Sequence, residues 1–346
     1  MKATHHKHIL DFKRPSGTSR GILKQKETWF IHLVSEGKQG IGECGILRSL
    51  SIDDRSDYEE KLRWTCENIA LGEAALLREL IEFPSIQFGV EQAFRSLRAD
   101  SPFLLHPSAF TEGTEAIDIN GLIWMGDESF MKSQIKDKLA EGFSCIKMKI
   151  GAIDFETELN LLKSIRKEYS ASDIELRVDA NGAFTPETAL EKLKRLSELD
   201  LHSIEQPIKQ GQLAEMARLC EVTPLPIALD EELIGVFHLS EKQQILETIQ
   251  PQFIILKPSL VGGYAGSNEW ISLASKQHID WWITSALESN IGLNAIAQWT
   301  HTLQNKLPQG LGTGSLYTNN FEAPLIIQKG ALHYRSEVSW KVPYIH

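Results

Sequence analysis

The stretch SCIKMKIG, residues 144–151, places two lysines inside an otherwise apolar run. Side chains along a strand alternate between its two faces, so Lys147 and Lys149 would point one way and Ile146 and Met148 the other. Two neighbouring buried ammonium groups are unfavourable unless negative partners lie opposite them. The run therefore predicts a buried strand whose lysines face an acidic cluster formed by other parts of the chain.

This strand belongs to a series of β-rich runs that alternate with helical segments from about residue 116 onward. The runs are AIDINGLI, CIKMKIG, IELRVDA, SIEQP, PIALDE, FIILKPS, DWWITSA and QGLGTG. Amphipathic segments lie between them, and those that begin at Asp154 and at Thr185-Pro186 open with helix start signals. Repeated units of about 25 to 30 residues favour an α/β fold, a TIM-like (β/α)7-8 barrel. An open doubly wound sheet is the alternative, which the lack of a glycine-rich dinucleotide motif weakens.

The two ends of the chain follow a different pattern. In residues 1–112, TWFIHLVSEG and GIGECGIL indicate antiparallel strands, and helical segments follow around SDYEEKLRWTCENIALG and EAALLREL. Residues 323–346 return to a β-like pattern, and we expect this tail to pack against the N-terminal unit. The expected organisation is an α+β unit over 1–112, a barrel over 113–322, and a tail over 323–346 that completes the first unit.

The composition excludes several classes of partner. Acidic residues outnumber basic ones 46 to 36, giving a formal charge of -10, which disfavours nucleic acid and anionic membranes. The four cysteines are widely spaced without a CxxC pair, as expected of free thiols in a reducing compartment. No signal peptide and no apolar run of roughly 18 residues is present, so we expect a cytoplasmic protein. The sequence does not indicate an oligomeric state.

Polar side chains stand at the C-terminal ends of six successive predicted strands. They are Lys149, Asp179, Glu205, Asp230, Lys257 and Ser285, at intervals of 30, 26, 25, 27 and 28 residues. A single such residue is more often a helix cap or a loop anchor. Six in register would converge on one mouth of the barrel, where barrels carry their active sites. We interpret Glu231 and Glu232, beside Asp230, as supporting charges.

Three of these groups, Asp179, Glu205 and Asp230, are carboxylates that would repel one another unless a cation lies between them. An all-oxygen set without His or Cys favours Mg²⁺, with Mn²⁺ as a substitute. Lys149 and Lys257 lie on strands to either side, and one of them could act as a base with a lowered pKa. This arrangement suits removal of the α-proton of a small-molecule carboxylate substrate, because the metal neutralises the resulting enediolate.

The motifs KMK, RVDANGAF, IEQP, ALDE, LKPSLVGG and SALESNIG resemble those of the muconate-lactonising subgroup of the enolase superfamily. Within it, FKRPSGTSRGIL, GIGECGILRSLS, QFGVEQA, INGLIWMGD and GLGTGSLYTNNF are similar to the o-succinylbenzoate synthase family, over nearly the whole chain. The resemblance implies a capping domain, built from the N-terminal part and the tail, that closes over the barrel. It also implies dehydration of 2-succinyl-6-hydroxy-2,4-cyclohexadiene-1-carboxylate to o-succinylbenzoate, a step of menaquinone biosynthesis.

The same resemblance assigns roles to individual residues. The metal ligands would be Asp179, Glu205 and Asp230. Lys149 would take the α-proton and return it to the departing hydroxyl, Lys257 would stabilise the enediolate, and Lys147 would support the electrostatics of the site. The implied substrate contacts are Arg177, Ser285, Ser289, Gly310 and Gly312, together with a mobile loop of Ser16, Gly17, Thr18, Ser19 and Arg20. Ala286 departs from the family pattern, in which a second serine is common.

Other functions remain possible at such a site. With lysines on both sides, racemisation of an N-acylamino acid, epimerisation of a dipeptide and muconate cycloisomerisation are alternatives. GTGSLYTNN lacks the Asp-x-Asp pair expected of a dipeptide epimerase. A catalytically inactive binding barrel would be expected to have lost a ligand or a lysine, and none is missing. A metal site at His5, His6 and His8 is a further alternative, although we expect these histidines on a solvated edge.

Overall fold

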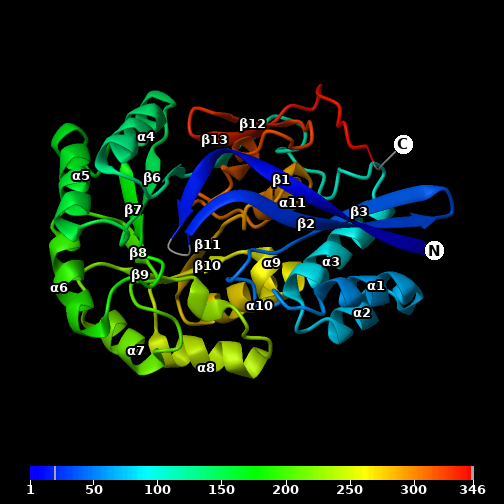
Figure 1. Ribbon diagram of the computed structural model, residues 1–346, viewed down its shortest axis with the longest axis horizontal. Helices are drawn as coiled ribbons and strands as arrows, with labels where there is room; N and C mark the ends of the chain where they lie inside the picture. Colours follow the sequence, from blue (N-terminus) through cyan, green and yellow to red (C-terminus); the bar gives the residue numbers. More distant parts are fainter. Residues whose placement is uncertain (19–20, 344–346) are drawn as a thin grey trace.

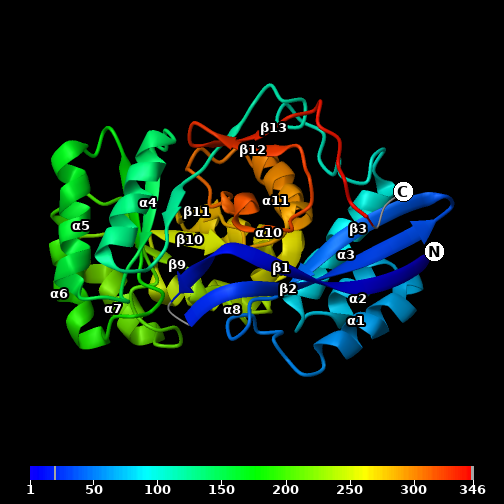
Figure 2. The same ribbon diagram turned by 45° about the horizontal axis from the view of Figure 1, so that its top comes forward.

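The computed structural model describes residues 1–18 and 21–343. Barrel elements occupy one side of the molecule, and the N-terminal strands and helices occupy the other (Figure 1). A long hairpin of β1 (Lys2–Thr18) and β2 (Gly21–Ser35) reaches from the N-terminal side across to the barrel (Figures 1 and 2). The hairpin therefore brings the first part of the chain next to the barrel strands.

Within the described residues, seven parallel strands form the barrel sheet in the order of the sequence. These strands are β5 (Gly121–Ile123), β6 (Cys145–Lys149), β7 (Glu175–Asp179), β8 (Ser203–Glu205), β9 (Ile227–Leu229), β10 (Phe253–Leu256) and β11 (Asp280–Ile283). The helices that follow them are α4 (Glu128–Ala140), α5 (Phe155–Glu168), α6 (Pro186–Ser197), α7 (Leu213–Val222), α8 (Leu239–Ile249), α9 (Pro258–Val261), α10 (Gly263–Lys276) and α11 (Asn290–Thr302). The predicted barrel class is confirmed.

Two local strand predictions are wrong. AIDINGLI forms two short pieces, because β4 (Ile117–Asp118) pairs antiparallel with the C-terminal tail and only β5 joins the barrel. QGLGTG forms no regular strand. It contributes single bridges instead, in which the Asn120 N–H donates to the Gln309 carbonyl (2.9 Å) and the Gly310 N–H to the Ile283 carbonyl (2.8 Å). These bonds close the gap between β5 and β11.

The N-terminal unit is an antiparallel sheet of β1, β2 and β3 (Lys38–Gly45), covered by α1 (Tyr58–Glu67), α2 (Glu73–Glu79) and α3 (Pro84–Arg98). Buried apolar residues such as Trp29, Ile31 and Val90 form its core. Helix α3 lies very close to the sheet, because a Cβ placed on Gly89 would be 2.1 Å from the Cys44 Sγ. The predicted antiparallel strands and helices are present here.

The C-terminal tail contacts both parts of the molecule. Its strands β12 (Leu325–Gln328) and β13 (Ala331–Tyr334) form a hairpin that pairs with β4. Further on, the Trp340 ring stacks on Phe103 of the N-terminal part at 4.3 Å between centroids. The division of the chain at residues 112 and 322 stays a prediction.

Two buried carboxylates of the N-terminal unit hold it against helix starts of the barrel. Glu43, at the end of β3, accepts hydrogen bonds from the N–H groups of Ser289 (2.9 Å) and Gly292 (2.8 Å) at the start of α11. Glu91, in α3, accepts from the N–H groups of Tyr264 (2.5 Å) and Ala265 (2.9 Å) at the start of α10. Helix N-termini favour negative charge because their first N–H groups lack partners within the helix. The two contacts fix the N-terminal unit over the barrel.

Glu91 makes a testable contribution to the pH dependence of stability. Burial raises the pKa of Glu91 from 4.5 to about 8, although the two backbone N–H groups oppose the shift. The folded protein then binds a proton that the unfolded chain releases, so this contribution to stability is complete below pH 4.5 and is lost as the pH rises to about 8. We expect it to lower the free energy of unfolding by up to about 1.4 kcal/mol per pH unit in this window.

Denaturant unfolding at several pH values checks this expectation. The Glu91→Gln variant carries no titrating group at this position, so the difference between wild type and variant should change between pH 4.5 and 8. A constant difference across that range would show that Glu91 titrates at its ordinary pKa.

No helix in residues 1–18 and 21–343 has the length and apolar character needed to cross a membrane.

Candidate active site

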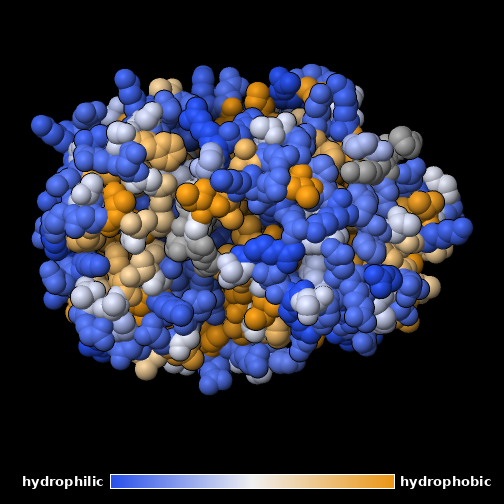
Figure 3. All heavy atoms as spheres, viewed as in Figure 1, coloured by the Kyte–Doolittle hydropathy of each residue, from blue (hydrophilic) through white to orange (hydrophobic). Residues whose placement is uncertain are grey.

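The C-terminal ends of the barrel strands open into a cavity of about 600 Å³. The β1–β2 hairpin and residues 47–50 contribute to its lining from the N-terminal side. Apolar side chains gather in the middle of the face on which the hairpin meets the barrel (Figure 3), and Ile22, which lines the cavity, is 68% exposed. The predicted site residues that line the cavity are Lys147, Lys149, Asp179, Lys257, Ser285, Gly310 and Gly312.

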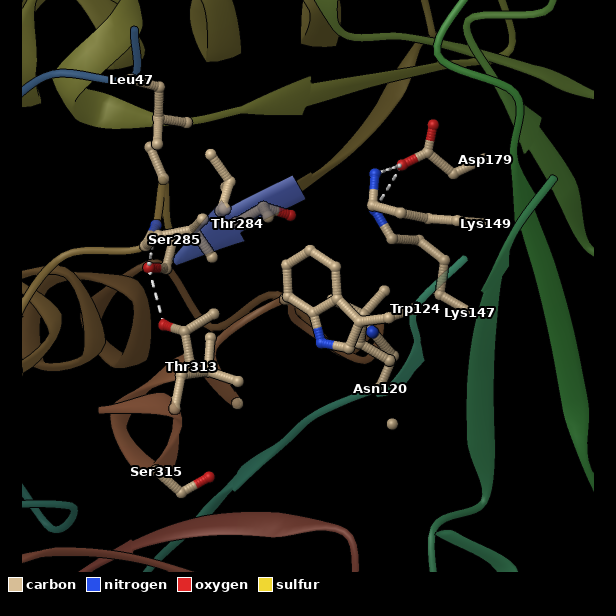
Figure 4. Close-up of a pocket in the computed structure, with 18 of the residues that line it drawn as sticks. Leu47, Asn120, Trp124, Lys147, Lys149, Asp179, Thr284, Ser285, Thr313 and Ser315 are labelled. Atoms are coloured by element: carbon tan, nitrogen blue, oxygen red, sulfur yellow. Dashed lines mark hydrogen bonds and ion pairs between the residues drawn. The ribbon is translucent and has the colours of Figure 1, made fainter. Parts of the chain in front are cut away.

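The two lysines of β6 both reach Asp179 at the end of the neighbouring strand β7 (Figure 4). The Lys149 Nζ lies 2.8 Å from the Asp179 Oδ2, and the Lys147 Nζ lies 3.3 Å from the same atom. Lys147 also contacts the Glu205 Oε2 at 2.7 Å, and Lys149 donates to the Asn181 Oδ1 at 2.8 Å. The acidic partners expected opposite KMK are therefore present.

Lys257 closes the network on the other side. It follows β10 and pairs with Asp230, and its Nζ lies 3.8 Å from the Glu205 Oε1. In the sheet the carboxylate-bearing strands β7, β8 and β9 lie between β6 and β10. The amines of Lys149 and Lys257 thus flank the three carboxylates, as the spacing of the sequence predicts.

The electrostatics of this network favour charged lysines. Burial opposes the charge of Lys147, but Glu205 and Asp179 outweigh it and raise the pKa of this lysine. Burial likewise opposes the charge of Lys257, and Asp230 and Glu205 outweigh it and raise its pKa. The expected lowering of a lysine pKa is therefore not seen at these two residues, because each contacts a carboxylate directly.

The donor set fits a divalent cation, although Lys147 contacts both Asp179 and Glu205. Among residues 1–18 and 21–343, no three His, Cys, Asp or Glu side chains are grouped closely enough to hold a metal as they stand. The Glu205 Oε1 is nevertheless buried without a hydrogen-bond donor. Asp179, Glu205, Asp230 and Glu231 also outnumber the three lysines. All four offer oxygen ligands, so the residues suit Mg²⁺ or Mn²⁺.

Three predicted substrate contacts line the cavity, and one of them, Ser285, lies across it from the lysines (Figure 4). The Ser285 hydroxyl donates to the Glu288 Oε2 (2.6 Å) and accepts from the Thr313 hydroxyl (2.8 Å). Gly310 packs against Thr284, whose Oγ1 would lie 2.5 Å from an added Cβ, whereas Gly312 leaves room. Ser285, Gly310 and Gly312 line the same cavity as the lysines.

Arg177 and Ser289 lie outside the cavity lining. The buried Arg177 guanidinium donates to Glu175 (2.7 Å) and to the Pro308 carbonyl (2.9 Å), and it lies 4.2 Å from the Trp282 ring centroid. The Ser289 hydroxyl donates to Glu43 at 2.5 Å. Their contacts therefore support the barrel and the joint with the N-terminal unit, and they give no support to a role in substrate binding.

Residues 16–18 of the predicted loop form the end of strand β1. Ser16 is buried, and Gly17 bridges to Met125 of the barrel. Gly17 pairs with Ile22 within the sheet, and an added Cβ would lie 2.6 Å from the Met125 carbonyl oxygen. A glycine is therefore needed at position 17 because the Met125 backbone lies so close to it, and not because of the backbone freedom expected from the sequence. Thr18 ends β1, and Ser19 and Arg20 lie outside the described residues.

Several cavity residues were missed from the sequence. Asn181 lies in the turn that follows β7, where strand alternation no longer applies, and its signal in the sequence is a polar side chain close after Asp179. Asn120 and Trp124 flank β5, and Thr313 follows the eighth barrel segment. None of the three is charged, so the search for charged residues at strand ends did not find them. Leu47 reaches the cavity from the N-terminal unit (Figure 4).

The histidines near the N-terminus belong to another surface. His6 and His8 contact the Phe30 ring, and the His5 Nδ1 lies 3.7 Å from the Cys66 Sγ. All three lie on the edge strand β1, as predicted, but they are half-buried rather than fully solvated.

The fold and the site together define an enzyme barrel of the enolase type. The profile of the family described as enolase C-terminal domain-like matches residues 131–337. A dipeptide epimerase from Enterococcus faecalis, solved in complex with Mg and a dipeptide, shares this fold. Its TM-score is 0.84 at 17% identity, with 96% of each chain covered.

A narrower relationship comes from Desulfotalea psychrophila. Its o-succinylbenzoate synthase is 45% identical over 363 residues, which cover 96% of this chain and 98% of the relative. The crystal structure of MenC from the same organism superposes with a TM-score of 0.86 at 42% identity, covering 96% and 99% of the two chains. The chain belongs to the o-succinylbenzoate synthase family of the enolase superfamily.

Proposed function

We propose that this protein dehydrates 2-succinyl-6-hydroxy-2,4-cyclohexadiene-1-carboxylate to o-succinylbenzoate, a step of menaquinone biosynthesis. The observation that carries the proposal is a buried row of carboxylates flanked by Lys149 and Lys257, within a chain 45% identical to a synthase of this activity. Both lysines line the cavity together with Asp179, and Glu205 and Asp230 lie behind its lining. The substrate is a small carboxylate, and the lysine-rich cavity supplies positive charge for it.

The roles of the residues follow from their places around the cavity. Lys149, in its neutral form, takes the proton from the ring carbon that bears the carboxylate, and the electron pair of that C–H bond passes toward the carboxylate. The pair then returns to form a ring C=C bond as the C–O bond breaks, and Lys149 gives the proton to the departing hydroxyl, which leaves as water. Lys257 stabilises the negative charge of the intermediate from the other side, and Lys147 holds Asp179 and Glu205 in place.

Asp179, Glu205 and Asp230 would hold a divalent cation, for which Mg²⁺ is the natural choice and Mn²⁺ a substitute. When bound, this cation supplies positive charge to the oxygens of the substrate carboxylate. The proposal draws support from the buried all-oxygen set and from the Glu205 oxygen without a donor.

The direct test supplies the purified protein and Mg²⁺ with the cyclohexadiene substrate and follows the aromatic product by ultraviolet absorbance. We expect turnover with this substrate. N-succinylamino acids, followed by loss of optical rotation, form a parallel arm because lysines on both sides allow proton transfer to either face. Turnover of these compounds alone would contradict the proposal.

A further inference from the structure

We infer that Trp124 forms the surface on which the ring of the substrate lies, so that this residue selects cyclic over acyclic succinyl carboxylates. The inference rests on the proposed function and adds a specificity-determining residue to it. Trp124 directly follows β5 and lines the cavity.

The position of the indole is the first support. Its ring projects into the middle of the pocket, between Lys147 and Lys149 on one side and Ser285 and Thr313 on the other (Figure 4). A substrate whose carboxylate meets the lysines and whose succinyl group extends toward the opposite wall must pass over this ring. The indole therefore lies beside the reacting part of such a molecule.

The second support is that the backbone of Trp124 is held from two sides. The Gln134 side chain, in α4, accepts from the Trp124 N–H (2.9 Å) and donates to the Trp124 carbonyl (3.0 Å). The next residue, Met125, bridges to Gly17 of the hairpin. Because the backbone is fixed in this way, only the side-chain torsions of the indole remain free, so less conformational freedom is lost when the ligand binds.

The third support is the chemistry of the ring. The substrate carries a conjugated six-membered ring, which becomes planar and aromatic in the product. A flat indole face stacks well on a planar ring, and such aromatic pairs contribute beyond simple burial. An acyclic N-succinylamino acid offers the same carboxylates without the ring, so it gains much less from Trp124.

The test measures binding of o-succinylbenzoate and of N-succinyl-L-alanine to the Mg²⁺-loaded protein by titration calorimetry. In Trp124→Leu we expect Kd for o-succinylbenzoate to rise about fivefold to tenfold. In Trp124→Phe, which keeps an aromatic ring, it should rise by less than about threefold. Kd for N-succinyl-L-alanine should change less than about twofold in both variants. Trp64→Phe, in α1 and away from the cavity lining, serves as the matched control.

Intrinsic fluorescence gives a second readout that does not depend on the leucine variant. Adding o-succinylbenzoate should quench wild type and Trp64→Phe but leave Trp124→Phe nearly unchanged. Equal losses of affinity for both ligands, or quenching that survives in Trp124→Phe, would overturn the inference. Wild-type protein that binds o-succinylbenzoate but fails to form it would instead contradict the proposed function.

Discussion

Replacing Lys149 by alanine is expected to lower kcat for dehydration by about 10⁴-fold, because one amine serves both as base and as acid. The fold should persist, since Asp179 keeps its contact with Lys147 at 3.3 Å and Lys149 lines the cavity rather than packing in the apolar core. Steady-state kinetics with the cyclohexadiene substrate measure the effect, and far-UV circular dichroism checks the fold.

Two further variants sharpen this result. Lys163→Ala, on the exposed side of α5, is the matched control and should retain wild-type turnover. Lys257→Ala removes charge stabilisation without removing the base, so we expect a loss of about 10² to 10³-fold. Substantial turnover in Lys149→Ala would assign the base to another residue.

Removal of the divalent metal should also cause a large loss of dehydration activity. Exhaustive chelation is expected to abolish dehydration, and added Mg²⁺ should restore it, because the substrate carboxylate loses the positive charge that stabilises the enediolate. In Asp230→Asn one ligand charge is lost, so Kd for Mg²⁺ should rise at least about tenfold by calorimetry.

The exposed Glu221→Gln, in α7, controls for the loss of one negative charge elsewhere. Its affinity for Mg²⁺ should equal that of wild type. Turnover that persists after complete chelation would exclude a metal role for Asp179, Glu205 and Asp230.

The sequence alone determined the barrel and the lysines and carboxylates at the ends of its strands. A period of two placed Lys147 and Lys149 on one face, and the regular spacing of βα units brought Asp179, Glu205 and Asp230 to the same end of the sheet. Both inferences depend on local geometry: strand side chains alternate, and parallel strands end at a common edge. They needed no knowledge of distant contacts.

The tertiary structure decided which surfaces complete the cavity. Gly17 meets Met125 although 108 positions separate them, and Ser289 turns to Glu43 rather than to the cavity. Arg177 shares a strand with Asp179 but finds its partners at Glu175 and Pro308. A local pattern fixes the face of the strand on which a side chain lies. The partner of that side chain depends on how distant segments pack, because the interior must be filled and its buried polar groups must all find hydrogen bonds at the same time.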